Sequence, residues 1–254
     1  MGVLISAGCS YARAPVETKE RVHQRGEFYA IRGNSYGQLV AEKYGMHFID
    51  VTRDGNNNDT IVGSLIAGIN LAKKTYPGHR VVALVGWSLI SRLEVWWAAD
   101  SRFVTAMPLH GGHGGDTKHP MFGMHTSFIK FWSPEYGWYR YQQAVQQAVL
   151  YARSQSVLLI QENNLEVFAA YPKVSVGKEV GTVFASSDVL SNIVGDQEAG
   201  DAISRMCGRP SWRERIMTRE GYYDGSNHPT QLAHQEKALL ISTEYDQQLK
   251  DYAK

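Results

Sequence analysis

The feature that most constrains this chain is an alternation of short apolar runs with longer segments of helical periodicity. Four runs are typical of buried strands: Val3 to Ala7, His47 to Val51, Arg80 to Val85 and Val157 to Gln161. Helical spacing of apolar residues marks four other segments: Asn34 to Tyr44, Asp59 to about Pro77, Tyr139 to Ser154 and Pro229 to about Leu249. Strands that alternate with helices in this way form parallel sheets covered on both faces. The sequence therefore predicts an α/β fold, a three-layer sandwich with a mostly parallel central sheet.

Capping residues and glycines set the expected boundaries of these elements. Asn34 or Ser35 can cap the first helix, and Gly45 can end it. Asp59 is the expected cap of the second helix, and Gly86 is expected to end the third strand. Pro229 suits an early position of the last helix.

Two stretches do not follow the alternation. Residues 101–138 are rich in glycine, histidine and aromatic residues, and residues 169–209 mix short apolar runs with polar turns. We read both as excursions from the sheet that can shape a pocket, and expect the second to be partly helical. Because no linker, repeat or low-complexity tract separates them from the rest, we expect residues 1–254 to form a single domain.

Composition narrows the class of function. Apolar residues make up 43% of 254 residues, which is enough for a buried core, and the formal net charge is +1. No basic cluster predicts a nucleic-acid partner, and no apolar run reaches the roughly 18 residues of a membrane helix. Cys9 and Cys207 lie far apart, and the sequence shows no signal-peptide pattern after Met1. We therefore expect a cytoplasmic protein, or one associated with a virion, with no cofactor, no metal, no nucleic acid and no membrane; the oligomeric state is left open.

Polar residues follow three of the predicted strands, where parallel sheets bind their ligands. Ser10 comes two residues after Gly8, a placement that exposes a nucleophilic hydroxyl beside backbone N–H groups. Asp54 to Thr60 is an asparagine-rich segment that opens a helix and can bind an oxyanion. Asp224 to Pro229 contains His228, which can take the serine proton, and Asp224, which can orient that histidine. Taken singly, each segment also suits an ordinary turn or helix cap.

The order and wide spacing of these segments resemble the SGNH hydrolases, the GDSL-like esterase and lipase superfamily. The matching segments are Gly8-Cys9-Ser10-Tyr11, Asn56 to Thr60, Gly86-Trp87-Ser88 and Asp224 to Pro229. The resemblance implies a flavodoxin-like fold, no metal, and hydrolysis of an acyl or acetyl ester. It implies a catalytic triad of Ser10, Asp224 and His228, and an oxyanion hole formed by Ser10, Asn58 and Ser88.

Several positions depart from the family pattern. Cys9 stands where aspartate is commonest, Asn58 where glycine is usual, and Ser88 where an asparagine side chain normally reaches the oxyanion. Asp224 and His228 are four residues apart instead of three. Losing one oxyanion donor can lower a rate by about 10²–10³. The chain is therefore either an esterase or deacetylase, or a weakly active or inactive relative that binds a glycan or a protein partner.

Other residues have rival interpretations. Cys9 is an alternative nucleophile, although packing is the more ordinary role for a buried thiol. Trp87 and Arg92 are candidate substrate contacts, and Arg92 can instead pair with Glu94. His110, His113, His119 and His125 gather near Asp116 without a spacing typical of zinc sites. An acylated carbohydrate is the expected substrate because aromatic residues that can stack on sugars are frequent here: Trp96, Trp97, Phe122, Phe131, Trp132, Trp138 and Tyr139.

Overall fold

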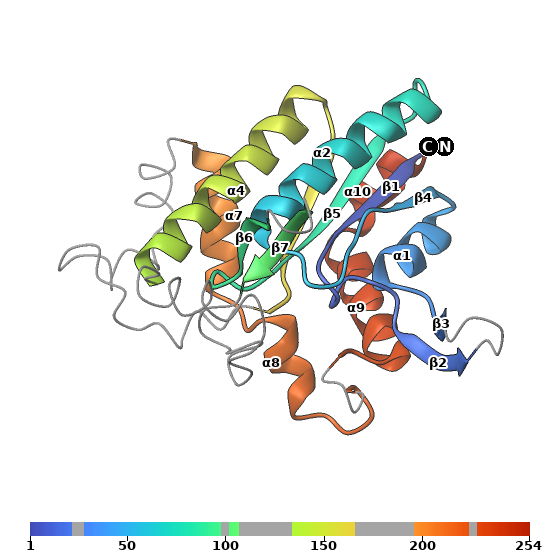
Figure 1. The fold of residues 1–254 in the computed structure, drawn as a ribbon. Coiled ribbons are helices and arrows are strands. Elements are labelled where there is room, and N and C mark those ends of the chain that lie inside the picture. Colours follow the sequence, from blue (N-terminus) through green and yellow to red (C-terminus); the bar gives the residue numbers. More distant parts are fainter. Residues whose placement is uncertain (22–27, 98–101, 107–133, 166–195, 224–227) are drawn as a thin grey trace.

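The computed structural model describes residues 1–21, 28–97, 102–106, 134–165, 196–223 and 228–254 (Figure 1). Its centre is a four-stranded sheet in the order β4-β1-β5-β8. β1 (Val3–Gly8) pairs in parallel with β4 (His47–Asp50) and β5 (Val81–Trp87), and β5 pairs in parallel with β8 (Leu158–Asn163). The predicted α/β class and parallel sheet are confirmed.

Helices cover both faces of this sheet, as Figure 1 shows. One face packs against α2 (Asn58–Thr75), α4 (Pro134–Ser154) and α7 (Gln197–Cys207). The other face packs against α1 (Tyr36–Tyr44), α9 (Gln231–Glu244) and α10 (Asp246–Ala253). Successive strand side chains point to opposite faces. Accordingly Val3 and Ile5 join the first core, whereas Leu4 joins the second.

The capping prediction is confirmed for the first helix and wrong for the second. Ser35 caps α1 by accepting a hydrogen bond from the Gln38 N–H, and Gly45 ends the helix at a φ of 63°. The cap of α2 is Asn57, so the prediction of Asp59 was wrong. Asp59 instead lies in the first turn of α2, where its carboxylate pairs with Arg140 of α4. An acidic side chain is stabilised there by the helix dipole even when it is not the cap.

Three other boundaries differ from expectation. β5 runs through Gly86 to Trp87, because pairing with β8 continues as far as Asn163. Helix α4 begins at Pro134, earlier than Tyr139. The last segment is two helices, α9 and α10, and Thr230 caps α9. Pro229 therefore precedes the helix instead of opening it.

The excursions contain some regular structure. β7 (Arg102–Ala106), at the start of the first excursion, pairs antiparallel with β6 (Leu93–Trp97), which precedes the excursion. The second excursion includes α7, which confirms that it is partly helical, and α8 (Trp212–Met217) follows it. A hairpin of β2 (Val16–Arg21) and β3 (Phe28–Arg32) was not predicted. Its first strand, VETKER, has too few apolar residues to show a buried strand.

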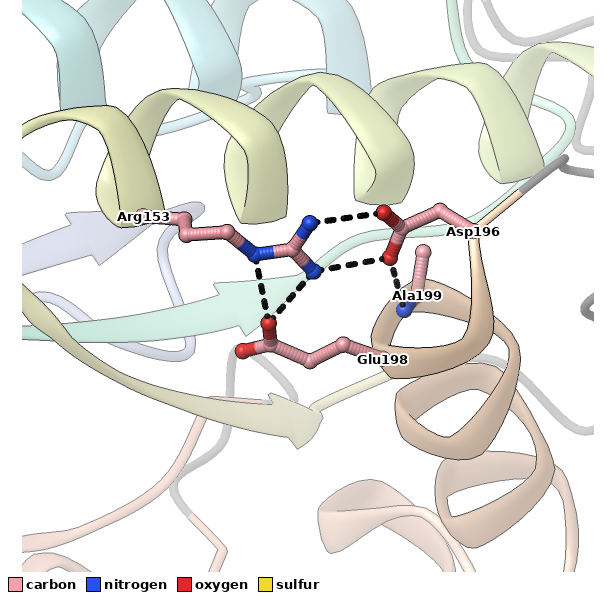
Figure 2. A network of polar contacts seen from close by, with 4 residues as sticks. All are labelled: Arg153, Asp196, Glu198 and Ala199. Carbon is pink, nitrogen blue, oxygen red and sulfur yellow. Dashed lines mark hydrogen bonds and ion pairs between the residues drawn. The ribbon is translucent and has the colours of Figure 1, made fainter.

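A polar network joins α4 to α7 (Figure 2). Arg153 near the end of α4 donates to both carboxylate oxygens of Asp196, at 2.9 and 3.0 Å, and to Glu198. Asp196 also caps α7 by accepting from the Ala199 N–H at 3.1 Å. The hydrogen bonds from Arg153 hold the pKa of Asp196 below its ordinary value. The carboxylate therefore stays charged as a cap and positions α7 at the β8 edge of the sheet.

None of the helices within the described ranges has the length and apolar character needed to cross a membrane.

Candidate active site

Ser10 lies in a tight turn at the carboxyl end of β1. The Cys9 carbonyl accepts from the N–H groups of Ala12 and Arg13, at 2.9 and 3.3 Å, which turns the chain directly after the strand. Gly8 is needed for this turn, because a Cβ there would lie 2.6 Å from the Ala12 Cβ and 2.9 Å from the Gly86 carbonyl oxygen. Ser10 is partly exposed at the turn. The placement predicted for a nucleophilic serine is present.

Cys9 is fully buried and packs in a small apolar cluster with Leu89, Trp212 and Ile216. A thiol without exposed surface cannot attack a substrate in this structure. The alternative of Cys9 as the nucleophile is therefore wrong, and its role is packing.

His228 is brought beside the serine turn although it lies near the other end of the chain. Its ring centroid is 5.8 Å from that of Tyr11, the residue after Ser10. Tyr11 also shares a hydrogen bond with the hydroxyl of Tyr223. Tyr223 and Pro229 form a β-bridge, and Pro229 directly follows His228. Tyr11 thus contacts both Tyr223 and His228, and so links the serine turn to this part of the chain.

The state of Tyr11 fits this linking role. Burial raises the pKa of its phenol far above the ordinary value, and the hydrogen bond to Tyr223 raises it further. Tyr11 therefore stays neutral and is a structural contact between the two segments. Asp224, the predicted partner of His228, lies outside the described residues, so its role stays a prediction.

The asparagine-rich segment lies against the end of β1. The amide of Asn56 donates to the Gly8 carbonyl at 3.1 Å. Asp54 pairs with Arg13, from the turn that carries Ser10, at 2.5 Å. The two predicted segments are therefore neighbours, as expected from the carboxyl ends of adjacent parallel strands.

Asn58 and Ser88 bind each other. The Ser88 N–H donates to the Asn58 side-chain oxygen at 2.8 Å, and the Asn58 amide donates back to the Ser88 carbonyl at 3.3 Å. Ser88 has no exposed surface. The prediction that Ser88 contacts an oxyanion is therefore wrong in this structure. The backbone N–H of Asn58 is the first of α2, and the helix itself has no acceptor for it.

Arg92 reaches the same group of residues. One guanidinium nitrogen donates to the Ser88 hydroxyl at 2.9 Å and to the Asn56 carbonyl at 3.2 Å. The side chain is partly exposed. Arg92 thus places a positive charge beside the segment that leads to Asn58. The side chain of Glu94, the alternative partner of Arg92, lies outside the described part.

Trp87 is not a substrate contact in this structure. It is fully buried, its indole N–H donates to Gln161 at 3.0 Å, and its ring meets Tyr141 of α4 edge-on. Trp138 is also buried and stacks on Tyr141 with 5.5 Å between ring centroids. Core packing explains both residues. The four clustered histidines, Asp116, Phe122, Phe131, Trp132 and the side chains of Trp96 and Trp97 lie outside the described part of the chain.

The sequence reasoning missed a buried polar cluster beneath the site, which we call the Lys237 cluster: Tyr36, Asn164, His234 and Lys237. The ammonium of Lys237 donates to the Asn164 side-chain oxygen, and the Asn164 amide donates to the Tyr36 hydroxyl at 3.3 Å. The backbone N–H of Tyr36 donates to His234 Nδ1 at 3.1 Å. These residues come from distant segments, and polar residues in α1 and α9 look like solvent-facing ones in sequence. No local signal could have found the cluster.

Burial sets the charge state of two members of the Lys237 cluster. Loss of water, followed in size by the nearby Lys237 charge, lowers the pKa of His234 to about 3. Loss of water also lowers the pKa of Lys237 to about 8, partly opposed by Glu162. At neutral pH, His234 is therefore an uncharged acceptor, and most Lys237 side chains remain charged.

Comparison with known proteins finds similar solved structures at low sequence identity. No family model matches the chain, and no curated protein matches it. Two solved structures are similar over 98% of this chain at 10% identity. One, the lipase/acylhydrolase from Enterococcus faecalis, is covered over 97% of its length with a TM-score of 0.45. The other, the psychrotrophic esterase EstA from Pseudoalteromonas sp., is covered over 100% with a TM-score of 0.42.

Proposed function

We propose that this chain hydrolyses acyl esters with Ser10 as nucleophile and His228 as its base. The observation that carries the proposal is the contact of the His228 ring with Tyr11, directly beside a partly exposed Ser10. An activated serine needs a base close to its hydroxyl and unused N–H donors close to the carbonyl oxygen of the substrate. The carboxyl end of β1 is where this fold can supply both.

The proposed reaction has two acyl transfers. The Ser10 oxygen attacks the carbonyl carbon as its proton passes to His228, and the resulting tetrahedral intermediate expels the alcohol, which takes that proton. Water then gives a proton to His228 and attacks the acyl-serine, which releases the acid and returns the proton to Ser10. Asp224, as the predicted orienting group, would hold the tautomer of His228 that accepts the proton.

The oxyanion would be held by backbone groups. The Ser10 N–H is not used by the turn after β1, and the Asn58 N–H is not used by α2. Arg92 adds a positive charge close to this segment, held on the Asn56 carbonyl. We propose that this charge compensates for the buried Ser88, which stands where the resembling family has an asparagine.

The substrate class is the finer part of the proposal. An acylated or acetylated carbohydrate remains our candidate, based on the aromatic residues of the first excursion. Trp138 no longer supports it, because that side chain is in the core. A panel of acetylated sugars and simple aryl esters would separate a deacetylase from a general esterase.

Labelling with a fluorophosphonate tests the nucleophile without knowledge of the substrate. We expect one adduct per chain by intact mass, mapped to the peptide with Ser10, and no adduct in Ser10→Ala or His228→Ala. Ser154→Ala, which changes an exposed serine in α4, is the matched control and should label fully. A folded protein that gives no adduct, or an adduct that survives Ser10→Ala, would refute the proposal.

A binding protein on the same scaffold is the second candidate. It is favoured by hydrogen bonds that already use both side chains expected at the oxyanion: Asn58 binds the Ser88 backbone, and the Ser88 hydroxyl accepts from Arg92. Such a protein would bind a glycan or a partner without turnover. Glycan binding by a folded sample that neither labels nor cleaves any ester would favour this candidate.

A further inference from the structure

A cavity lies at the β8 edge of the sheet. It has a volume of about 260 Å³ and is enclosed by the end of β8, the segment joining α7 to α8, and the second half of α9. None of Ser10, Tyr11, Arg92 or His228 lines it. Its ligand would therefore not be the acyl group bound at Ser10.

The charge of the lining is mainly positive. Four basic side chains contribute to it, Arg205, Arg209, Arg215 and Lys237, against the carboxylates of Glu162 and Glu244. One of those carboxylates already forms an ion pair, since Glu244 pairs with Arg209 at 2.9 Å. The three arginines are exposed at the entrance, whereas Lys237 is 1% exposed. The positive charge therefore extends from solvent to the wall of the cavity.

The buried donor groups on this wall are incompletely paired. Lys237 donates to the neutral Asn164 amide and lies over the rings of Tyr36 and Trp212, at 4.5 and 5.3 Å. Within the described residues, no carboxylate lies within ion-pair distance of Lys237, and Glu162, which also lines the cavity, only partly opposes the lowering of its pKa. The buried indole N–H of Trp212 has no hydrogen-bond acceptor. A buried ammonium without a direct ion pair and a buried donor without an acceptor are both costly. One bound oxyanion in contact with both would offset both costs.

We propose that this cavity is a binding site for a small oxyanion, a phosphate or carboxylate group of a small molecule, which Lys237 and the Trp212 N–H contact from the wall and Arg205 and Arg215 attract at the entrance. Oxyanions accept several charge-assisted hydrogen bonds at once, which matches this set of donors. Asn164 also joins Lys237 to Tyr36, and both Asn164 and Tyr36 lie against Gly86 of β5, the strand neighbour of Gly8. Binding of an oxyanion in this cavity is therefore expected to change the free energy of unfolding of the protein.

The test follows the indole N–H signal of Trp212 in a two-dimensional ¹H–¹⁵N spectrum of the full chain, assigned with Trp212→Phe. Inorganic phosphate and acetate are titrated separately at constant ionic strength, to distinguish a phosphate site from a carboxylate site. We expect a saturable shift with one of them, and a dissociation constant about tenfold or more higher in Lys237→Met. Lys250→Met, which removes an exposed lysine of α10 that does not line the cavity, should leave the constant unchanged.

The double variant Arg205→Gln, Arg215→Gln keeps the test open if Lys237→Met does not fold, because both arginines are exposed. We expect weaker and less salt-dependent binding in this variant. The proposal is overturned if the wild-type signal does not move with either anion, if Lys237→Met binds as tightly as wild type, or if the entrance variant binds unchanged. Fluorophosphonate labelling of the same samples reports separately on Ser10.

Discussion

Two basic side chains are held by neutral oxygens. Arg92 lies at the carboxyl ends of β1 and β5, the edge that carries Ser10 and that we call the serine edge, and Lys237 lies in the cluster beneath it. Arg92 donates to a hydroxyl and a backbone carbonyl, and Lys237 donates to an amide oxygen. Their surroundings differ, because Arg92 is partly exposed and Lys237 is 1% exposed. Water screens the first charge at little cost, whereas the second is desolvated and has a lowered pKa. The comparison indicates that a charge at the serine edge can serve chemistry, whereas a charge in the Lys237 cluster calls for a compensating anion.

The largest expected effect separates activity from stability at the serine edge. Ser10→Ala and His228→Ala should each lower turnover of an activated aryl ester by at least about 10⁴-fold, because each removes a group that acts in every transition state. Their thermal midpoints should stay near that of wild type, since neither side chain is part of the core. Substantial activity in either variant would show that the reaction does not take place at the serine edge.

The next effect is on stability and belongs to the Lys237 cluster. A Cβ at Gly86 would lie 2.0 Å from the Asn164 amide nitrogen and 2.6 Å from the Tyr36 hydroxyl. Gly86→Ala should therefore lower the free energy of unfolding by about 3 kcal/mol, through overpacking and a broken buried hydrogen bond. Gly63→Ala is the control, because Gly63 is exposed in α2 with nothing within 4 Å of a new Cβ, and it should be neutral or stabilising. Urea unfolding measures both, and equal stability of the two variants would contradict the close packing around Gly86.

Arg92 tests whether the exposed charge acts on the reaction. Arg92→Gln should lower kcat/KM by about 10²-fold with kcat falling as much, as expected for loss of a contact made in the transition state. Arg92→Lys should recover part of the rate, because it keeps the charge. A variant that changes only stability would assign Arg92 to holding the Ser88 turn.

The smallest expected effect is a pH dependence of stability from His234. Its pKa is about 3 in the folded chain and 6.5 as a free side chain, so the unfolded chain binds more protons between these values. Stability is then fully present above pH 6.5 and is lost as pH falls toward 3, by about 2 kcal/mol between pH 7 and pH 5. In His234→Gln the difference in unfolding free energy between pH 7 and pH 5 should shrink by this amount. An unchanged difference would mean that another group controls acid stability.

Prediction from sequence worked for elements whose signal is local. β1 and α1 were expected within two residues of their bounds, because an uninterrupted apolar run and a Ser35-to-Gly45 pair of caps mark them. The hairpin of β2 and β3 was missed, since its residues are mostly polar. The prediction of Trp87 as a substrate contact was wrong for a different reason. An aromatic residue at a strand end looks the same in sequence whether it faces solvent or the core.

The sequence alone determined the parallel α/β class and the order of the segments that carry Ser10, Asn58 and His228. Periodicity and capping are local, and the carboxyl ends of parallel strands must meet at one edge. Tertiary structure alone decided that the ring of His228 contacts Tyr11, that Ser88 is buried beneath Arg92, and that Lys237 is enclosed near Trp212. These facts depend on contacts between residues far apart in the chain, and burial sets the charge state and access of each group only once those contacts have formed.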